Sequence, residues 1–273
     1  MSETREKIKS IIPRPVLTLM RETRDGLNRA GQWPAATFHP WRRESIQRLA
    51  ALKDTRRGER CFVIGNGPSL KNTDMSLLRN ENTIGMNRIY LMFPELGFQT
   101  TYLVTVNDLV IEQCAEDLQN LELPRFVSWR SRKWLHPDTD LHFLYSTYTG
   151  EKFAKDVTGR VWEGATVTYV SLQLAYHLGF EEVILIGVDH SFASQGKPNT
   201  TVVSQGDDPN HFSAAYFGKG FRWQLPDLDT SEIGYQRARM AFEADGRKIV
   251  DATVGGKLQV FPKVDYDSLF GQD

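Results

Sequence analysis

Short apolar runs recur along the chain after residue 58, and most of them end in a polar or glycine-containing turn. They predict strands at 61–64, 82–86, 101–106, 125–128, 141–145, 182–187 and 248–252. Stretches with helical spacing of apolar residues fall between several of these runs. This alternation predicts an α/β fold with a doubly wound, mostly parallel sheet, whose sites lie beyond the carboxyl ends of the strands.

The clearest helix-to-strand unit opens at Gly164, continues to Leu178 and ends at Gly179, before the strand at 182–187. Upstream, the stretch 41–53 has helical spacing and is followed by a break at 56–58. We therefore expect a basic helical N-terminal arm over 1–57 and a Rossmann-like nucleotide-binding catalytic domain over 58–273. Within this domain, residues 189–229 show no periodicity and contain several glycines and aromatic residues. Such a long segment inside a domain predicts an active-site lid.

The first strand of the domain runs into a turn with the sequence Gly-Asn-Gly-Pro-Ser at residues 65–69. Glycines permit a sharp turn and Pro68 can start a helix, so we expect ligand phosphate at that helix end. The pattern is not a dinucleotide fingerprint, because Leu70 replaces the third glycine and Asn87 stands where a ribose-binding acid belongs. It is not a Walker loop either, since Lys71 is followed by Asn72. A sharp turn without a ligand is the alternative.

Polar side chains follow four of the predicted strands: Asn66, Asn87, Asn107 with Asp108, and the run from Asp189 to Ser191. An asparagine both donates and accepts hydrogen bonds without carrying charge. Three of them suit a base, a ribose and a phosphate better than a metal. For any single asparagine, a turn or helix cap is the alternative.

Two histidines are placed for chemistry, His190 directly after a strand and His211 in the predicted lid. A neutral imidazole that titrates near pH 6.5 can remove a hydroxyl proton as a general base. The alternative for each is a structural histidine bonded to a loop carbonyl. Asp189 could orient its neighbour, hold a metal or cap the lid.

The chain has 273 residues, a net charge of −1 and two cysteines, which are too few for a disulfide framework or a cysteine zinc site. We find neither a membrane span nor a secretory signal, so we expect a cytoplasmic protein. Residues 1–60 hold 14 Lys or Arg against 7 Asp or Glu. The arm could lie on an anionic inner membrane, or pack on its own domain or a second subunit. Nucleic acid is not expected, because no aromatic platform accompanies the basic residues.

Several blocks carry a resemblance to known families: Val63–Lys71, Met86-Asn87, Val106-Asn107 and Leu178–Asp189. They resemble bacterial CMP-sialic acid sialyltransferases of lipooligosaccharide synthesis. They are also similar to a wider family that contains the motility-associated-factor flagellin glycosyltransferases and the archaeal 6-hydroxymethylpterin diphosphokinases, as is the block Asp251–Lys257. The resemblance covers roughly residues 58 to 265.

The resemblance implies nucleotide binding, because the sialyltransferase asparagines that match Asn66, Asn87 and Asn107 contact the CMP-sugar. The family's catalytic histidine lies in a lid segment near the place of His211, and Ser191 stands where a tyrosine holds the leaving phosphate. The leading hypothesis is an inverting glycosyltransferase that uses a CMP-activated sugar to modify a bacterial surface glycan, without a required metal. His211, or failing that His190, would be the base.

Two other functions stay open. One is a diphosphokinase that uses ATP and magnesium, with Asp108 and Asp189 as metal ligands. The other is a non-catalytic nucleotide-binding protein. The expected catalytic residues are His211, His190 and Asp189, and the expected nucleotide-binding residues are Gly65, Asn66, Gly67, Pro68, Ser69, Asn87, Asn107, Asp108, Thr166 and Ser191.

Overall fold

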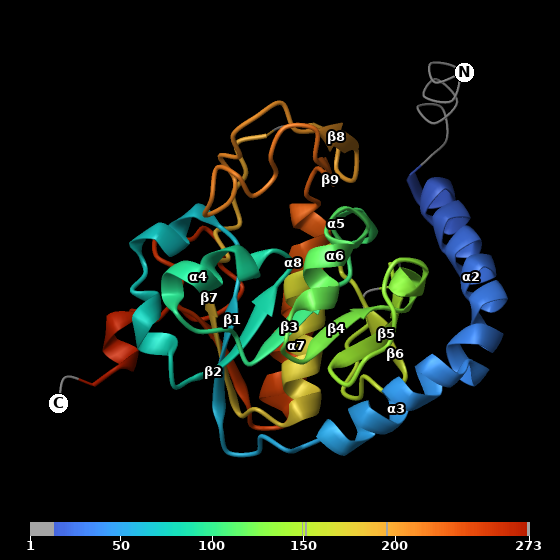
Figure 1. Ribbon diagram of the computed structural model, residues 1–273, viewed down its shortest axis with the longest axis horizontal. Coiled ribbons are helices and arrows are strands. Elements are labelled where there is room, and N and C mark those ends of the chain that lie inside the picture. Colours follow the sequence, from blue (N-terminus) through green and yellow to red (C-terminus); the bar gives the residue numbers. More distant parts are fainter. Residues whose placement is uncertain (1–13, 149, 151, 195, 272–273) are drawn as a thin grey trace.

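The computed structural model describes residues 14–148, 150, 152–194 and 196–271, and its centre is a parallel sheet of eight strands (Figure 1). Their order across the sheet is β10-β7-β1-β2-β3-β4-β5-β6, and every pairing is parallel. The strands are β1 Arg60–Ile64, β2 Asn82–Met86, β3 Tyr102–Thr105, β4 Arg125–Ser128, β5 Leu141–Thr147, β6 Arg160–Trp162, β7 Glu182–Ile186 and β10 Lys248–Asp251. The predicted doubly wound α/β fold is confirmed.

The direction in which the chain builds the sheet reverses once, beside β1. Strands β1 to β6 are added in one direction, and β7 then returns to pair with the other side of β1. Such a reversal leaves a crevice beyond the carboxyl ends of the two strands, where α/β proteins bind their ligands. The turn after β1 and the segment after β7 therefore meet at the expected site.

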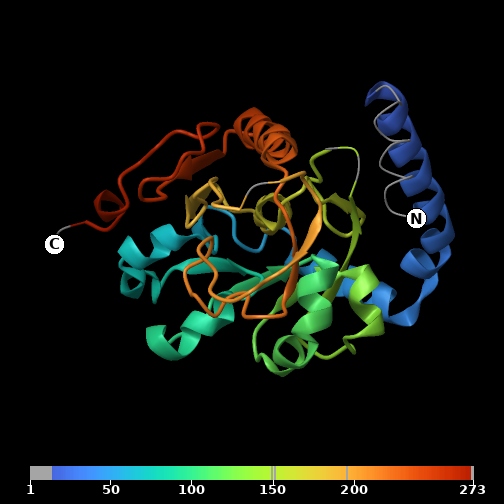
Figure 2. The same ribbon diagram turned by 90° about the horizontal axis from the view of Figure 1, so that it is seen from above.

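Helices cover both faces of the sheet (Figure 2). The helices are α2 Arg14–Phe38, α3 Pro40–Leu52, α4 Phe93–Leu96, α5 Asp108–Gln113, α6 Ala115–Asn120, α7 Val167–Leu178 and α8 Leu228–Ala244. Short 3-10 helices lie at Pro68–Asn72, Met75–Leu78, Ile89–Met92, Trp129–Lys133 and Asp267–Leu269. Helices α7 and α8 contribute to one core, and α4, α5 and α6 to the other.

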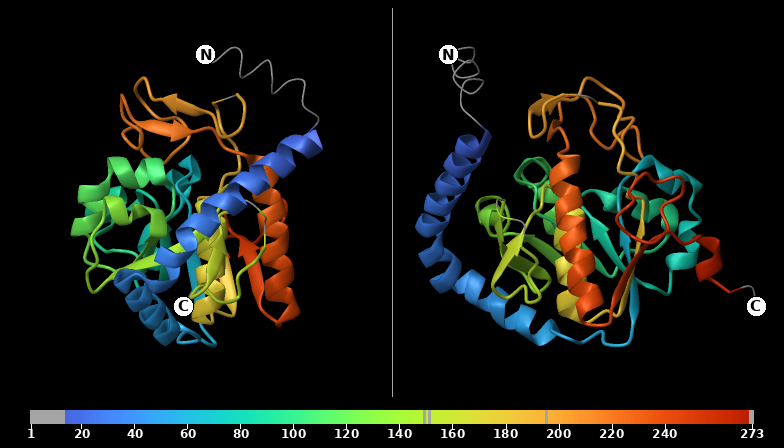
Figure 3. Two further views of the ribbon diagram at one scale, coloured as in Figure 1. Left: turned by 90° about the vertical axis from the view of Figure 1, so that its right-hand side faces the viewer. Right: turned by 180° about the vertical axis from the view of Figure 1, so that it is seen from behind.

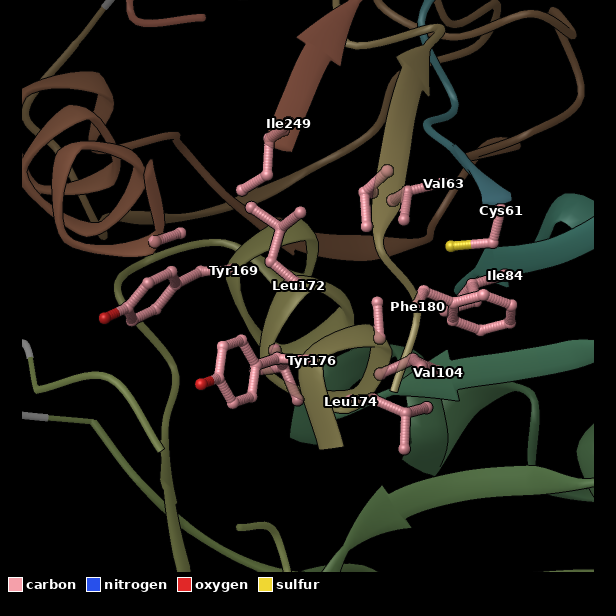
Figure 4. Packing of buried hydrophobic residues seen from close by; sticks show 14 of the residues in the cluster. Cys61, Val63, Ile84, Val104, Tyr169, Leu172, Leu174, Tyr176, Phe180 and Ile249 are labelled. Atoms are coloured by element: carbon pink, nitrogen blue, oxygen red, sulfur yellow. The ribbon is translucent and has the colours of Figure 1, made fainter. Parts of the chain in front are cut away.

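Alternate residues of β1 enter opposite cores, as the two-residue period of a strand requires. Cys61 and Val63 pack with α7, whereas Phe62 and Ile64 pack on the other face. Figure 4 shows Tyr169 and Leu172 of α7 on the same side of the sheet as Val63. The sheet is thus buried on both faces, which explains its continuous apolar strands.

Helix α7 confirms the helix-to-strand unit that the sequence predicts. The Thr166 hydroxyl accepts a hydrogen bond from the Thr168 backbone N–H and caps the start of the helix. Gly179 ends it with φ +101°, a conformation that glycine adopts without steric cost. Thr166, at the start of α7, faces the same space as the residues that follow β1, β2, β3 and β7.

The predicted lid crosses above the carboxyl ends of the strands (Figure 3). It contains a small antiparallel pair, β8 Thr201–Val203 and β9 Arg222–Gln224. Gln113 at the end of α5 exchanges two hydrogen bonds of 2.8 Å with the backbone of Arg222. These bonds fasten the lid to the body of the domain.

The predicted arm is helical from Arg14 onward, and its residues 1–13 lie outside the described residues. Pro15 is the second residue of α2, a position in the first turn where a helix tolerates proline, and Pro34 lies inside the same helix. Helix α2 stands beside the sheet edge (Figure 2), and its exposed apolar side chains include Val16, Leu19, Met20 and Leu27. No helix in the described ranges is both long and apolar enough to span a membrane.

Candidate nucleotide-binding and transfer site

A cavity of about 890 Å³ lies beyond the carboxyl ends of the strands, under the lid. Its volume is in the range of small-molecule sites. The predicted site residues that line it are Gly65, Asn66, Gly67, Asn87, Asn107, Asp108, Thr166, Asp189, His190, Ser191 and His211. Pro68 and Ser69 are not among the lining residues, so the structure does not support their expected contact with a nucleotide.

The turn after β1 packs directly against the segment after β7. A Cβ atom on Gly65 would lie 2.1 Å from the Gly187 carbonyl oxygen, and one on Gly67 would lie 1.8 Å from Oδ2 of Asp189. Both contacts are shorter than atoms tolerate, so only glycine fits these two positions. The glycines therefore serve close packing between two loops.

The helix after this turn differs from our expectation. Residues Pro68–Asn72 form a 3-10 helix of five residues, and the carboxylate of Asp189 occupies its start. The Ser69 backbone N–H and hydroxyl donate to that carboxylate at 3.1 and 2.6 Å. Where we expected ligand phosphate, the protein supplies its own anion. Asp189 therefore accepts two hydrogen bonds from Ser69 within the protein.

The three asparagines divide into two kinds. The Oδ1 atoms of Asn66 and Asn87 are buried and have no hydrogen-bond partner among the described residues, although Nδ2 of Asn66 donates to the Met86 carbonyl at 3.1 Å. Oδ1 of Asn107 instead accepts from the backbone N–H groups of Leu109 and Val110 and caps α5. The cap alternative therefore applies to Asn107, while Asn66 and Asn87 leave two acceptors unused.

His211 is held in place by a carboxylate and an aromatic ring. Its Nδ1 lies 2.7 Å from Oδ2 of Asp208, whose other oxygen accepts from the Asn210 backbone N–H at 2.8 Å. The imidazole stacks on Tyr216, with ring centres 4.0 Å apart and planes 7° apart. Because Asp208 fixes the proton on Nδ1, Nε2 remains the acceptor, which is the arrangement of a general base.

His190 is engaged differently, even though it lines the same cavity. Its outer nitrogen, Nε2, lies 2.8 Å from Oε1 of Glu232 on α8. Only Nδ1, the nitrogen beside its own backbone, is left, and that backbone has φ +53°. Of the two candidate bases, His211 has the better geometry.

Asp108 belongs to a charged cluster at the β3–β6 end of the cavity that the sequence did not predict. Arg130 lies 3.0 Å from Asp108 and 2.8 Å from Glu163. Burial lowers the pKa of Arg130, but the charges of Glu163 and Asp108 outweigh this effect and raise the pKa overall. The guanidinium is therefore permanently charged between two carboxylates, and Asp108 has a partner within the protein.

Four residues of the site were missed, for identifiable reasons. Asp208 stands three residues before His211, a spacing that could have revealed it. Arg130 and Glu163 reach the cavity, and Glu232 reaches His190, only through the tertiary fold, and Glu163 follows β6, a strand that was not predicted. Among the described residues, no group of three or more His, Cys, Asp or Glu side chains is arranged to hold a metal ion.

Comparison with known families agrees with the resemblance seen in the sequence. Residues 40–195, more than half of the chain, match the family model described as 6-hydroxymethylpterin diphosphokinase MptE-like. The chain belongs to this family. The match to the MptE-like model covers α3, the strands β1 to β7, helix α7 and the first residues of the lid. His211 and Asp208 lie beyond it.

Two solved structures are similar to this MptE-like chain. The MAf glycosyltransferase from Magnetospirillum magneticum AMB-1 is 16% identical, with a TM-score of 0.49 over 83% of this chain and 38% of that one. The sialyltransferase CstII from Campylobacter jejuni, solved with cytidine-5'-monophosphate, is 16% identical, with a TM-score of 0.42 over 76% and 85%. This chain thus spans well under half of the Magnetospirillum protein. No curated protein matches it.

Proposed function

We propose that this protein is a glycosyltransferase that moves a sugar from a CMP-activated donor to an acceptor hydroxyl. The observation that carries the proposal is the pair formed by Asp208 and His211 at a cavity that also contains unpartnered amide oxygens. A base with a free nitrogen serves a hydroxyl nucleophile, and unused acceptors serve a ligand rich in N–H and O–H groups. The sequence resemblance to sialyltransferases selects CMP.

In this reaction the acceptor oxygen attacks the anomeric carbon while the bond from that carbon to the phosphate oxygen breaks. The hydroxyl proton passes to Nε2 of His211, and CMP departs with the electrons of the broken bond. Asp208 stabilises the imidazolium that forms. Attack from the face opposite the leaving group inverts the anomeric centre.

The start of α7 offers the departing phosphate a favourable field. Thr166 and its neighbours through Thr168 line the cavity, and the aligned peptide dipoles give this helix end a partial positive charge. The Thr166 hydroxyl lies 3.4 Å from the Tyr235 hydroxyl, which orients it. We assign the leaving phosphate to α7 rather than to the short helix after Pro68.

The family name supports a second candidate, an ATP-dependent diphosphokinase, in which His211 would activate a hydroxyl for attack on phosphorus. This reaction commonly uses magnesium held by carboxylates. Asp108 and Asp189 do not fit one such ion. They follow β3 and β7, which β1 and β2 separate by about 14 Å at the usual strand spacing, and each already has a partner. We therefore rank glycosyl transfer first.

Thermal unfolding with added nucleotides separates these functions. A ligand at 100 times its Kd stabilises a protein by about 2.7 kcal/mol. We expect CMP or CTP to raise the Tm without magnesium. Stabilisation only by ATP with magnesium would contradict the glycosyltransferase and support the diphosphokinase. No change in Tm with any nucleotide would contradict both functions.

Turnover of CMP-sialic acid, followed as CMP release with a lipooligosaccharide acceptor, tests the base. His211→Ala should lower kcat by about 10² or more while CMP still binds, because the imidazole acts on the proton. Glu232→Gln is the matched control, since it changes only the carboxylate that holds His190. Full turnover in His211→Ala would remove this residue from the role.

We further propose that the arm places the enzyme at the cytoplasmic side of an anionic membrane, where glycolipid acceptors lie. The excess of basic residues in 1–60 suits such a surface, as do the outward apolar side chains of α2.

A further inference from the structure

The lid segment that carries His211 is attached to both turns that hold the unpartnered asparagines. The Phe212 backbone N–H donates to the Asn66 carbonyl at 2.9 Å. Arg88, the residue after Asn87, donates through Nη1 to the Tyr216 carbonyl. The lid is therefore bonded to the cavity floor on both sides of the base.

Arg88 also lies against the aromatic rings of the lid. Its guanidinium carbon is 5.3 Å from the ring centre of Phe221 and 5.8 Å from that of Tyr216. Its backbone N–H donates to the Tyr216 hydroxyl at 3.4 Å. Tyr216 is thus contacted by Arg88 at its carbonyl, ring and hydroxyl.

Tyr216 in turn positions the imidazole of His211, the proposed base. Its side chain is fully buried, and its ring is the one on which the His211 imidazole stacks. Phe217 contacts the same imidazole edge-on at 4.8 Å. Because the rings of Tyr216 and His211 are nearly parallel and stacked face to face, a shift of Tyr216 would move the imidazole relative to Asp208.

The turn that contains Asn87 and Arg88 is itself held by hydrogen bonds to the rest of the domain. Asn87 has φ +49°, and its backbone N–H donates to the Val104 carbonyl at 3.0 Å. Arg88 Nε donates to the Tyr90 hydroxyl, which donates to Asp117. A ligand bound to Oδ1 of Asn87 therefore acts on a turn whose next residue holds the lid.

We propose that Arg88 is a positioning residue that couples nucleotide occupancy at Asn87 to the placement of the His211 imidazole. This inference rests on the proposed function, in which Asn87 contacts the nucleotide and His211 is the base. Arg88 is not among the residues that line the cavity. It holds Tyr216, and Tyr216 holds His211. A nucleotide bound at Asn87 therefore stabilises the position of the His211 imidazole through these contacts.

Steady-state kinetics provide the first test. Arg88→Ala should lower kcat by about tenfold or more and change the Kd of CMP by less than about threefold, whereas Arg88→Lys should recover part of kcat because an amine can still reach the Tyr216 carbonyl. Adding Arg88→Ala to His211→Ala should cause no further loss, since both act through one imidazole. Additive losses would overturn the proposal.

Amide hydrogen exchange provides a readout that is independent of turnover. CMP should protect residues 208–217 in the wild type, and this protection should fall in Arg88→Ala although CMP still binds. The matched control is Arg79→Ala. Like Arg88, Arg79 donates to backbone carbonyl oxygen and lies over an aromatic ring, but its partners, Leu96, Gly97 and Phe98, are outside the lid. This variant should match the wild type in exchange and kcat.

The outcomes separate the two proposals. If wild-type protein binds CMP and needs His211, yet lid protection is equal in the wild type and Arg88→Ala, the coupling is wrong and the function stands. If CMP does not bind, the function fails, and the exchange test is repeated with ATP and magnesium. Failure of both nucleotides to protect the lid of the wild type would overturn the coupling as well.

Discussion

Asn66 and Asn87 are unusual at the scale of single residues because each keeps a buried oxygen that has no partner in the part of the chain that the structure describes. Leaving a buried acceptor unpaired costs about 1–3 kcal/mol. A protein that accepts this cost in two neighbouring turns gains the ability to pair both atoms with a ligand. Asn107 does not share this feature, because its oxygen caps α5.

This difference makes a prediction about matched substitutions. Asn66→Ala should weaken CMP binding by about tenfold, because a hydrogen bond worth about 1.4 kcal/mol is lost. Asn107→Ala should instead lower the free energy of unfolding by about 1 kcal/mol through loss of the helix cap. Calorimetric titration and urea unfolding measure the two effects. Wild-type CMP affinity in Asn66→Ala would contradict the assignment.

Most of the site residues that the sequence predicted line the cavity, because side chains directly after parallel strands must gather at one edge of the sheet. His211 was found without its partner, although Asp208 is close in sequence. The role of Asp189 could not be foreseen, since its hydrogen bonds with Ser69 depend on β1 and β7 being neighbours. The local sequence pattern predicts that a residue lies at the carboxyl edge of the sheet, but the order of the strands decides which of these residues are in contact.

At the scale of elements, the long apolar strands were predicted within one or two residues, because burial on both faces leaves continuous apolar runs. Strands β6, β8 and β9 were missed, since each has only three residues and lacks a readable period. The helix that was predicted to start at Pro68 differs from its prediction for a local reason. Its start resembles that of an α-helix, but the chain forms two short 3-10 helices before β2.

The packing between the β1 and β7 loops can be tested at Gly65. In Gly65→Ala the new Cβ would meet the Gly187 carbonyl oxygen, so the free energy of unfolding should fall by about 2–3 kcal/mol. Gly206→Ala is the matched control, because no atom of the described ranges lies within 4 Å of its Cβ position. Urea unfolding measures both. Equal stability of the two variants would show that the loops separate freely.

Helices α3 and α7 are joined by His177, and this contact predicts a pH dependence. Nε2 lies 2.8 Å from the Leu49 carbonyl and Nδ1 accepts from the Val157 N–H, so the neutral imidazole satisfies both. Burial lowers the pKa of His177 below its ordinary value of about 6.5. Below pH 6.5 the unfolded chain binds more protons, so the free energy of unfolding should fall from pH 7 toward pH 5.

His177→Gln should reduce this slope, because an amide can make both hydrogen bonds without titrating. Urea unfolding at several pH values measures the slope, and substitution of the exposed His136 serves as the control. Burial also lowers the pKa of His142, so part of the slope should remain in His177→Gln. A slope that is unchanged in this variant would contradict the role of His177.

At the scale of the whole molecule, the strand order could not be predicted from the sequence. The apolar runs give the number and direction of most strands but not their neighbours. The return of β7 to β1 unites the segments near residues 65 and 189, and the lid then brings residue 211 above them. This long-range arrangement makes one site out of parts that the sequence presents separately.

Helix α2 turns polar residues toward the body, since Arg24, Asn28 and Gln32 line the cavity, while apolar side chains remain exposed. If an anionic membrane covers them, Leu19→Glu with Leu27→Glu should weaken binding to phosphatidylglycerol vesicles by at least about tenfold. Leu77→Glu, at an exposed leucine elsewhere, is the control. Sedimentation with vesicles measures binding. A wild-type dimer that these substitutions dissociate would assign the surface to a second subunit.

The lid carries His211, the proposed base, whereas the strand ends carry the groups assigned to the nucleotide. The groups proposed to retain the donor and the group proposed to activate the acceptor therefore lie in different stretches of the chain. If these assignments hold, a sequence change confined to the lid would replace the reaction while the sheet kept its nucleotide-binding groups. The fold thus allows new chemistry to arise by exchange of a loop, without rebuilding the site from which the donor is delivered.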